Sequence, residues 1–327
     1  METLLQDLRY GFRMLRTSPG FTIVAVLTLA LGIGANTAVF SVLDAVLLKM
    51  IPVQDPAQLV AVGDPSRIGS TSNGTPRLDL FSFPLYRELR DNNHSFSGLF
   101  ASGDPRRLIV RLQGESGDGE KVNGRLVTAN YFSVLGVNPI LGRTFTTEED
   151  ETRGGAPLVV INYDFWKRRF GLAPDVLGRT VTFNRQPYTI IGVLPKGFDG
   201  EITDYVVDVF FPMGMQGQIM PGRDYLDNPN TSALMLMGRL KPGVSVAQAK
   251  EDVNLAFKRA LEGNYGARLT VDDRTALQKP SNANIIEVTP GGKGFSRLRH
   301  SFSQPLVLLM AVVGLVLGCV NTTLVCS

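Results

Sequence analysis

Cysteine and histidine are scarce in this chain, and their scarcity excludes several kinds of chemistry. The 327 residues include two cysteines and two histidines, and both cysteines, Cys319 and Cys326, lie in an apolar stretch near the C-terminus. Structural zinc sites draw their ligands mainly from these two residue types. On a helix, a spacing of seven residues separates two positions by about 10 Å, which is too far for a disulfide. We therefore expect no metal, no cofactor and no disulfide in the fold.

Short motifs of catalytic and nucleotide-binding sites are also missing. The sequence has no HExxH pair, no GxSxG elbow and no GxxxxGK[ST] phosphate loop. The nearest match to the phosphate loop is GGKG at residues 291–294, which lacks the spacing and the hydroxyl and is predicted to be an ordinary loop. We predict that the chain is not an enzyme and contains no catalytic, cofactor-binding or metal-binding residues.

Neither sign of charge is in large excess. There are 33 basic and 30 acidic residues, and the formal net charge is +3. Such a chain lacks the strong positive field that attracts polyanions. Nucleic acid is therefore not an expected partner.

Two long apolar runs lie near the ends of the sequence. Residues 21–48 carry one charge, Asp44, and residues 304–327 carry none. About 20 apolar residues suffice for a helix to cross a bilayer. Asp44 would lie about 34 Å along the first helix, near the far interface, which favours a helix-end polar contact over a functional role. We expect a membrane protein with transmembrane helices at 21–48 and 303–327, although a signal peptide remains a competing interpretation of the first run.

The distribution of basic residues predicts the orientation in the membrane. Residues 1–20 have the pattern of an amphipathic helix with Arg9, Arg13 and Arg16 on its polar face, which suits a membrane surface or packing on protein. After the first run, Lys49 is the nearest basic residue. The positive-inside rule then predicts a cytoplasmic N-terminus and an extracytoplasmic domain at residues 49–302.

The segment between the two runs has the pattern of an α+β domain. Two β-α-β units are expected next to the membrane, and residues 113–210 are expected to form an inserted, distal subdomain of mixed α/β structure. Ser245 and Gln248 form a predicted capping box at the start of one helix. In chain order, the elements of the two units are a strand at 59–62, a helix at 84–91, a strand at 108–112, a strand at 233–240, a helix after 245 and a strand at 285–288. Elements predicted within the inserted subdomain are helices at 129–135 and 163–170 and strands at 159–161, 181–184 and 188–193.

Several carboxylates could be taken for a catalytic cluster. They are Asp204, Asp208 and the run Glu148, Glu149, Asp150 and Glu151. Charged residues at turns usually face solvent, and carboxylates are rarely buried without a partner. We therefore predict solvated carboxylates without a catalytic role.

The remaining candidates are one histidine and a group of aromatic residues. His94 lies in the polar stretch NNHS and is predicted to be a solvated loop residue. Trp166 and Phe170 lie about one turn apart on a predicted helix, with Tyr163 and Lys167 nearby. Aromatic residues at this spacing usually pack in a core, so a core role is favoured over a recognition surface.

Four segments of the sequence, in order, carry a resemblance to a known family. The chain resembles the permease subunit of ABC transporters of the MacB/FtsX type, most closely acidobacterial-style permeases with large periplasmic domains. The matching segments are residues 4–45, VTANYFSVLGVNPILGRTF at 127–145, LGRTVTFNRQPYTIIGVLPKGF at 177–198, and LKPGVSVAQAKEDV at 240–253.

The resemblance implies a fold, a location and a set of partners. It implies a multi-pass protein of the bacterial inner membrane, with four transmembrane helices per permease unit and the periplasmic domain between the first two. The implied partners are a cytoplasmic ABC ATPase, a second permease copy or duplicated permease half, the lipid bilayer and a periplasmic adaptor. The implied function is export by mechanotransmission, in which ATP-driven helix movement reaches the periplasmic domain. Because the sequence ends inside the second span, we expect a truncated form. A membrane-anchored sensor or scaffold with a binding ectodomain remains the alternative.

Overall fold

The chain divides into two compact units, each considered separately. One is Met50–Arg297, and the other combines Met1–Lys49 with Leu298–Ser327. The computed structural model describes residues 16–17, 19–43, 50–112, 115, 117–155, 157–222, 226–279, 281, 284–299, 305, 308 and 312.

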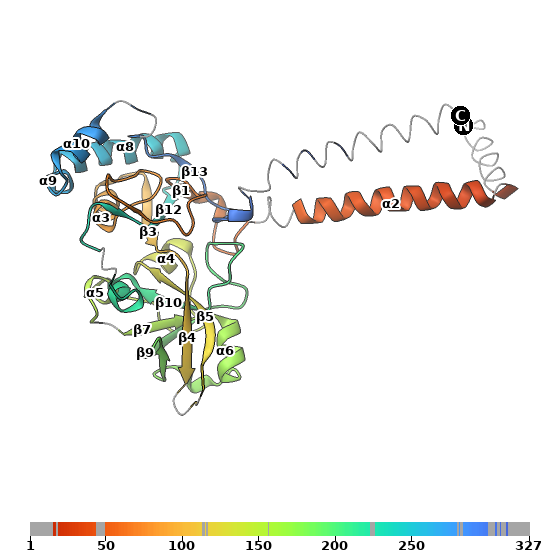
Figure 1. Ribbon diagram of the computed structural model, residues 1–327, viewed down its shortest axis with the longest axis horizontal. Helices are drawn as coiled ribbons and strands as arrows, with labels where there is room; N and C mark the ends of the chain where they lie inside the picture. The colour runs from red at the N-terminus through yellow and green to blue at the C-terminus, as the bar shows by residue number, and fades with distance from the viewer. Residues whose placement is uncertain are drawn as a thin grey trace. The chain divides into compact units, whose positions relative to one another are not determined.

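In the unit that contains both termini, the main described element is helix α2 (Pro19–Leu43), red in Figure 1. Among the residues described, no helix is both long and apolar enough to count as a membrane span. Residues 1–15, Asp44, both cysteines and nearly all of the second apolar run lie outside the described residues, as do the predictions made for them.

Four antiparallel strands form the first part of Met50–Arg297, in the order β3-β12-β1-β13. Helix α3 follows β1 and leads to β3, and helix α8 follows β12 and leads to β13, so two β-α-β units interleave in one sheet as in a ferredoxin-like fold. The two helices pack against each other. We call this part, residues 50–102 and 231–297, the sheet lobe. Its elements are η2 (Pro56–Gln58), β1 (Leu59–Val62), β2 (Ser72–Asn73), α3 (Phe83–Asn92), β3 (Phe96–Ser102), β11 (Thr231–Ser232), β12 (Met235–Leu240), α8 (Val246–Glu262), α9 (Asn264–Ala267), α10 (Val271–Gln278) and β13 (Val288–Pro290).

Six strands of the second part close on themselves into a small barrel. Each strand pairs with the next in the cycle β4-β5-β10-β7-β9-β8, and β8 pairs back with β4. Closure leaves no open edge among these strands. We call residues 103–230 the barrel lobe, which lies below the sheet lobe in Figure 1. Its elements are β4 (Arg106–Leu112), β5 (Glu120–Val127), α4 (Tyr131–Leu135), β6 (Leu141–Gly142), α5 (Thr147–Glu151), β7 (Leu158–Ile161), α6 (Tyr163–Phe170), η3 (Pro174–Val176), β8 (Thr180–Phe183), β9 (Gln186–Val193), β10 (Val209–Pro212), η4 (Met213–Met215) and α7 (Gln216–Ile219).

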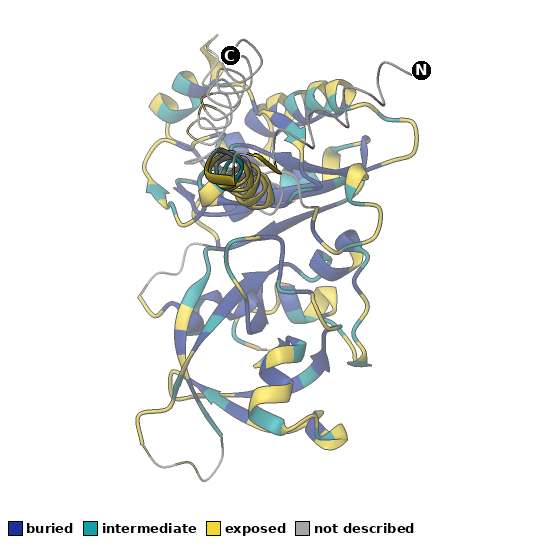
Figure 2. Cartoon of the chain, turned by 90° about the vertical axis from the view of Figure 1, so that its right-hand side faces the viewer, coloured by how far each residue is buried: buried dark blue, intermediate teal, exposed yellow. Residues whose placement is uncertain are grey.

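The sheets of the two lobes are joined through one residue pair, Ser102 of β3 and Val127 of β5. An aromatic cluster packs near this pair, with Tyr131 and Phe132 of α4 in edge contact with the rings of Phe100 and Phe210. Figure 2 shows that most of the strands are buried, whereas the helices carry exposed outer faces. The lobes therefore share a core, although their sheets barely touch.

The predicted elements agree with the structure where local sequence signals are strong. The strand at 59–62 is β1, the helix at 84–91 lies within α3, and the capping box of Ser245 and Gln248 begins α8. The strands at 233–240 and 285–288 overlap β12 and β13, and the helix at 163–170 is α6. The α+β class is thus confirmed.

The prediction for the first β-α-β unit is wrong in one element. Residues 108–112 were expected to close that unit, but they belong to β4 in the barrel, and the unit closes with β3, which the pattern did not predict. Strand β3 contains Gly98, where a Cβ would lie 2.5 Å from Cγ2 of Val134. Close packing of α4 against β3 therefore requires glycine at position 98, and a glycine weakens the sequence pattern by which a strand is predicted.

Candidate functional site

The first and last segments of the Met50–Arg297 unit contact each other. We call residues 50–58 the incoming segment and residues 291–297 the outgoing segment. The N–H of Ile51 donates to the carbonyl of Gly292 at 3.0 Å, and the N–H of Gly291 donates to Leu59 at 2.7 Å. A Cβ at position 292 would collide with the carbonyl oxygen of Pro56, so only glycine allows this approach. The two segments thus form one joint.

The outgoing segment is also bound to a loop of the barrel lobe. The N–H of Phe295 donates to the carbonyl of Glu201 at 2.7 Å, and the N–H of Thr203 donates to Phe295 at 2.9 Å. These bonds form an isolated parallel bridge between Ile202 and Phe295. Gly294 has φ +65°, and a Cβ there would meet the carbonyl oxygen of Glu201. The outgoing segment is therefore fixed to residues 201–203.

Directly beside this bridge lies a fully buried ion pair between Arg125 and Glu201. Nη2 of Arg125 lies 2.8 Å from Oε1 of Glu201, and both side chains are 0% exposed. The hydroxyl of Ser102 donates to Oε1 at 2.7 Å, and the hydroxyl of Tyr131 donates to Oε2 at 2.5 Å. The four side chains come from β5, the 201–203 segment, β3 and α4. This polar network therefore connects both lobes at the point where their sheets meet.

The electrostatics of the network are dominated by burial. Burial and the adjacent charge of Glu201 raise the pKa of Tyr131 well above its usual value, so its hydroxyl remains a donor. Nε and Nη1 of Arg125 are buried without a hydrogen-bond partner among the described residues. Nearby, burial raises the pKa of Asp104 against the opposing charges of Arg106, Arg125 and Arg297. A buried ion pair of this kind adds little net stability, but loss of one partner costs about 3 to 5 kcal/mol.

The incoming segment is held by the side chain of Arg239, on β12. Its Nη2 donates to the carbonyl of Gln54 at 2.6 Å, its Nε donates to Val134 at 2.7 Å and its Nη1 donates to Asp55 at 3.2 Å. Burial lowers the pKa of Arg239, but guanidinium groups stay charged in proteins. The N–H of Gln54 also donates to Leu135, the last residue of α4. Helix α4 therefore contacts the incoming segment at one end and Glu201, through Tyr131, at the other.

Two of the carboxylates that were predicted to be solvated are buried. Asp150 is 5% exposed and accepts the N–H groups of Ala129 at 3.0 Å and Met213 at 2.7 Å, and burial raises its pKa to about 6. Asp208 is 8% exposed and accepts from the N–H of Asn123 at 2.8 Å. The prediction was wrong for these two because backbone N–H groups from distant segments replace the lost water.

The other candidates have the structural roles predicted for them. Glu148 and Glu151 are exposed. Glu149 is partly exposed and pairs with Arg143 at 2.6 Å, and Asp204 is partly exposed and accepts from Ser296. His94 is exposed. Trp166 is buried, and Phe170 packs at the edge of the core. Within the part of the chain that the structure describes, no group of three or more histidine, cysteine or acidic side chains could hold a metal.

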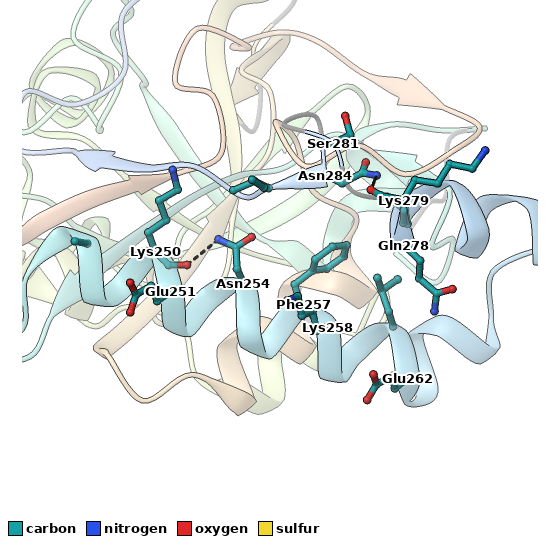
Figure 3. A pocket seen from close by; sticks show the side chains of 14 residues that line it. Lys250, Glu251, Asn254, Phe257, Lys258, Glu262, Gln278, Lys279, Ser281 and Asn284 are labelled. Atoms are coloured by element: carbon teal, nitrogen blue, oxygen red, sulfur yellow. Dashed lines mark hydrogen bonds between the residues drawn. The ribbon is translucent and has the colours of Figure 1, made fainter.

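A groove of about 1010 Å³ lies elsewhere, between α8, α10 and residues 281, 284 and 285 (Figure 3). Phe257 lines it, and charged side chains of both signs surround it, including Lys258 and Glu262. Lys250 is paired with Glu287 at 2.7 Å. The groove therefore has no excess of either charge to select a ligand.

An α+β unit whose two ends meet at a single joint suits a domain inserted between two segments of a longer protein. Residues 22–256 match the MacB-like periplasmic core domain, and the chain belongs to this family. The resemblance to MacB/FtsX-type permeases is thus confirmed at the level of the family.

Curated relatives and solved structures that resemble the chain carry names of the same kind. The chain is 28% identical over 189 residues to the macrolide export ATP-binding/permease protein MacB of Campylobacter jejuni, covering 57% of this chain and 26% of that protein. It is 27% identical over 154 residues to the probable syringafactin export ATP-binding/permease protein SyfD of Pseudomonas syringae, covering 47% and 22%. Among solved structures, the periplasmic region of MacB from Actinobacillus actinomycetemcomitans aligns with a TM-score of 0.46 and 15% identity, over 69% of this chain and 95% of that one. The chain spans about a quarter of the length of the curated relatives it matches.

Proposed function

We propose that this chain is the permease subunit of an ABC transporter and that residues 49–302 form its extracytoplasmic domain. The observation that carries this function is the joint, where Ile51 is bonded to Gly292 and Phe295 to Glu201. A domain that follows the movement of two membrane helices needs a rigid connection at the points where those helices join it. The names of the relatives, which pair ATP-binding and permease functions, support the assignment.

We further propose that residues 21–48 and 303–327 cross the bacterial inner membrane, with residues 1–20 on the cytoplasmic side and 113–210 farthest from the membrane. A helix of 28 residues is about 42 Å long, against about 30 Å of hydrocarbon. In α2, the described part of the first run, the hydroxyls of Thr37 and Ser41 each donate to the carbonyl one turn earlier at 2.8 Å. Polar groups satisfied within their own helix are compatible with a lipid environment.

In the proposed mechanism, this chain makes and breaks no covalent bond. A cytoplasmic ABC ATPase hydrolyses ATP and moves the terminal helices, and a second permease copy or duplicated half completes the transporter. The joint passes the movement to the sheet lobe through Arg239 and to the barrel lobe through residues 201–203, and a periplasmic adaptor or substrate receives it. The function is thus export by mechanotransmission.

Cysteine labelling tests the topology, because the Met50–Arg297 unit contains no cysteine. With Cys319 and Cys326 replaced by serine, Lys241→Cys is expected to react with a membrane-impermeant maleimide in intact spheroplasts. Gln6→Cys, the matched control, is expected to react only after lysis. Equal labelling of the two positions before lysis would contradict the topology.

Affinity isolation of the full-length protein from membranes tests the transporter itself. An ABC ATPase is expected to co-purify and to hydrolyse ATP. A signalling partner without ATPase activity would instead favour the sensor or scaffold. Extraction of the protein by carbonate would exclude all of these membrane functions.

A further inference from the structure

Glu201 contacts the outgoing segment through its main chain and the interior of the barrel lobe through its side chain. Its carbonyl accepts the N–H of Phe295, whereas its side chain accepts from Arg125, Ser102 and Tyr131. Both carboxylate oxygens are occupied, and neither is exposed to water. The main chain at residue 201 is therefore held in place by its own side chain.

The two lobes are also held together by their shared core and by hydrogen bonds such as those from Asn130 to Leu99 and from Arg239 to Val134, both at 2.7 Å, but none of these bonds is made by the outgoing segment. Their sheets share the single pair of Ser102 and Val127, so a continuous ladder does not transmit displacement between them. A buried ion pair contributes more to a unique geometry than to stability in several known systems. The burial of the Arg125 and Glu201 side chains as an ion pair is therefore better explained by a need to fix the geometry around residue 201 than by a gain in stability.

We propose that Glu201 is a positioning residue that couples the outgoing segment to the barrel lobe, with Arg125, Ser102 and Tyr131 as its fixed anchor. The role rests on the proposed function, since coupling matters only if the helices next to the joint move. Without the anchor, the outgoing segment is expected to lose its fixed position on the barrel lobe, and helix movement that arrives through this segment is lost before it reaches the barrel.

Spin labels on the full chain measure this coupling directly, in a background with both cysteines replaced by serine. Met50→Cys reports the joint, Lys167→Cys on α6 reports the barrel lobe, and Lys258→Cys on α8 reports the sheet lobe; all three positions are exposed. In the otherwise unchanged chain, the joint-to-barrel distance distribution is expected to be narrow. In Arg125→Met/Glu201→Leu it is expected to broaden about twofold, with the joint-to-sheet distribution unchanged as the internal control.

Thermal stability separates coupling from a structural role. Glu201→Leu alone leaves a buried, unpaired cation and is expected to lower the Tm by about 10 °C. The double variant removes both charges and is expected to regain most of that loss while the broad distribution persists. A double variant with a recovered Tm and a narrow joint-to-barrel distribution would show that the pair is only structural and would overturn the proposal.

A milder variant keeps the test valid if the double variant does not fold. Tyr131→Phe removes one hydrogen bond to Glu201 and is expected to broaden the joint-to-barrel distribution. Tyr188→Phe is the matched control, because that buried hydroxyl has no hydrogen-bond partner among the described residues. Equal distributions in the two variants would contradict the proposal. The distance measurements need no ATPase, so they can fail or succeed independently of the transporter assignment.

Discussion

Replacement of Arg239 is expected to loosen the incoming segment from the rest of the sheet lobe. The guanidinium makes two short bonds, at 2.6 and 2.7 Å, and one longer bond at 3.2 Å to main-chain carbonyls, and a fourth bond at 3.4 Å to the side-chain oxygen of Gln58. No other standard side chain offers donors in such a rigid fork. Arg239→Ala removes all four bonds, and Arg239→Lys keeps the charge but supplies donors from one point.

The expected loss of stability depends on the partial exposure of the Arg239 side chain. A hydrogen bond to a charged group contributes about 1.5 to 3 kcal/mol when buried, and water replaces part of that here. With about 1 kcal/mol for each bond to a carbonyl and little for the long bond to Gln58, Arg239→Ala should lower the free energy of unfolding by about 2 to 3 kcal/mol. Arg239→Lys should lower it by about 1 to 2 kcal/mol, because one ammonium cannot reach all of the carbonyls.

Urea denaturation of the Met50–Arg297 unit measures the global effect, and amide hydrogen exchange at Gln54 measures the local one. The control is Arg179→Ala, which removes the same side chain from an exposed pair with Asp175 and should change stability by less than about 0.5 kcal/mol. If the Arg239 and Arg179 variants were equally stable, or if Gln54 kept its exchange protection in Arg239→Ala, Arg239 would not hold the incoming segment in solution.

Three further changes test other parts of the structure. Because the pKa of Asp150 is raised from 3.8 to about 6, its contribution to stability is full below about pH 4 and is lost as the pH rises through about 6. Urea denaturation between about pH 4 and 7 should therefore show the wild type losing about 3 kcal/mol relative to Asp150→Asn. Gly292→Ala forces a methyl group against Pro56 and should lower the Tm measured by calorimetry, whereas Gly217→Ala, which meets nothing within 4 Å, should not. Trp166→Ala removes a buried indole and its hydrogen bond, and should cost about 3 to 5 kcal/mol in chemical denaturation.

The elements that could be predicted from the sequence are those whose ends are set by neighbouring residues. Helix α8 begins where Ser245 and Gln248 cap each other, and α6 begins where Asn162 accepts the N–H of Phe165. Closure of the barrel could not be predicted in the same way. It depends on the parallel pairing of β5 with β10. This pairing places Val127 beside Pro212, which lies far from it in the sequence.

The buried ion pair was missed for a related reason. Strand β5 alternates, so Lys121, Asn123 and Arg125 share one face and read as a solvated row. Lys121 is indeed exposed, but Arg125 is covered by the segment that carries Glu201. Burial of the last residue in such a row depends on where a distant loop folds, and no local pattern encodes that position.

The joint also limits the kind of movement that the proposed permease can transmit. Because Ile51 and Gly292 are hydrogen-bonded, the incoming and outgoing segments cannot separate without breaking a backbone bond. A change in the spacing of the terminal helices would therefore reach the unit as a tilt or shift of the whole joint. The incoming side is linked to α4 through Arg239, and the outgoing side is linked to the barrel lobe through Glu201, which α4 also contacts through Tyr131. Both routes end on one buried carboxylate, so the two lobes would receive the same displacement instead of opposing ones.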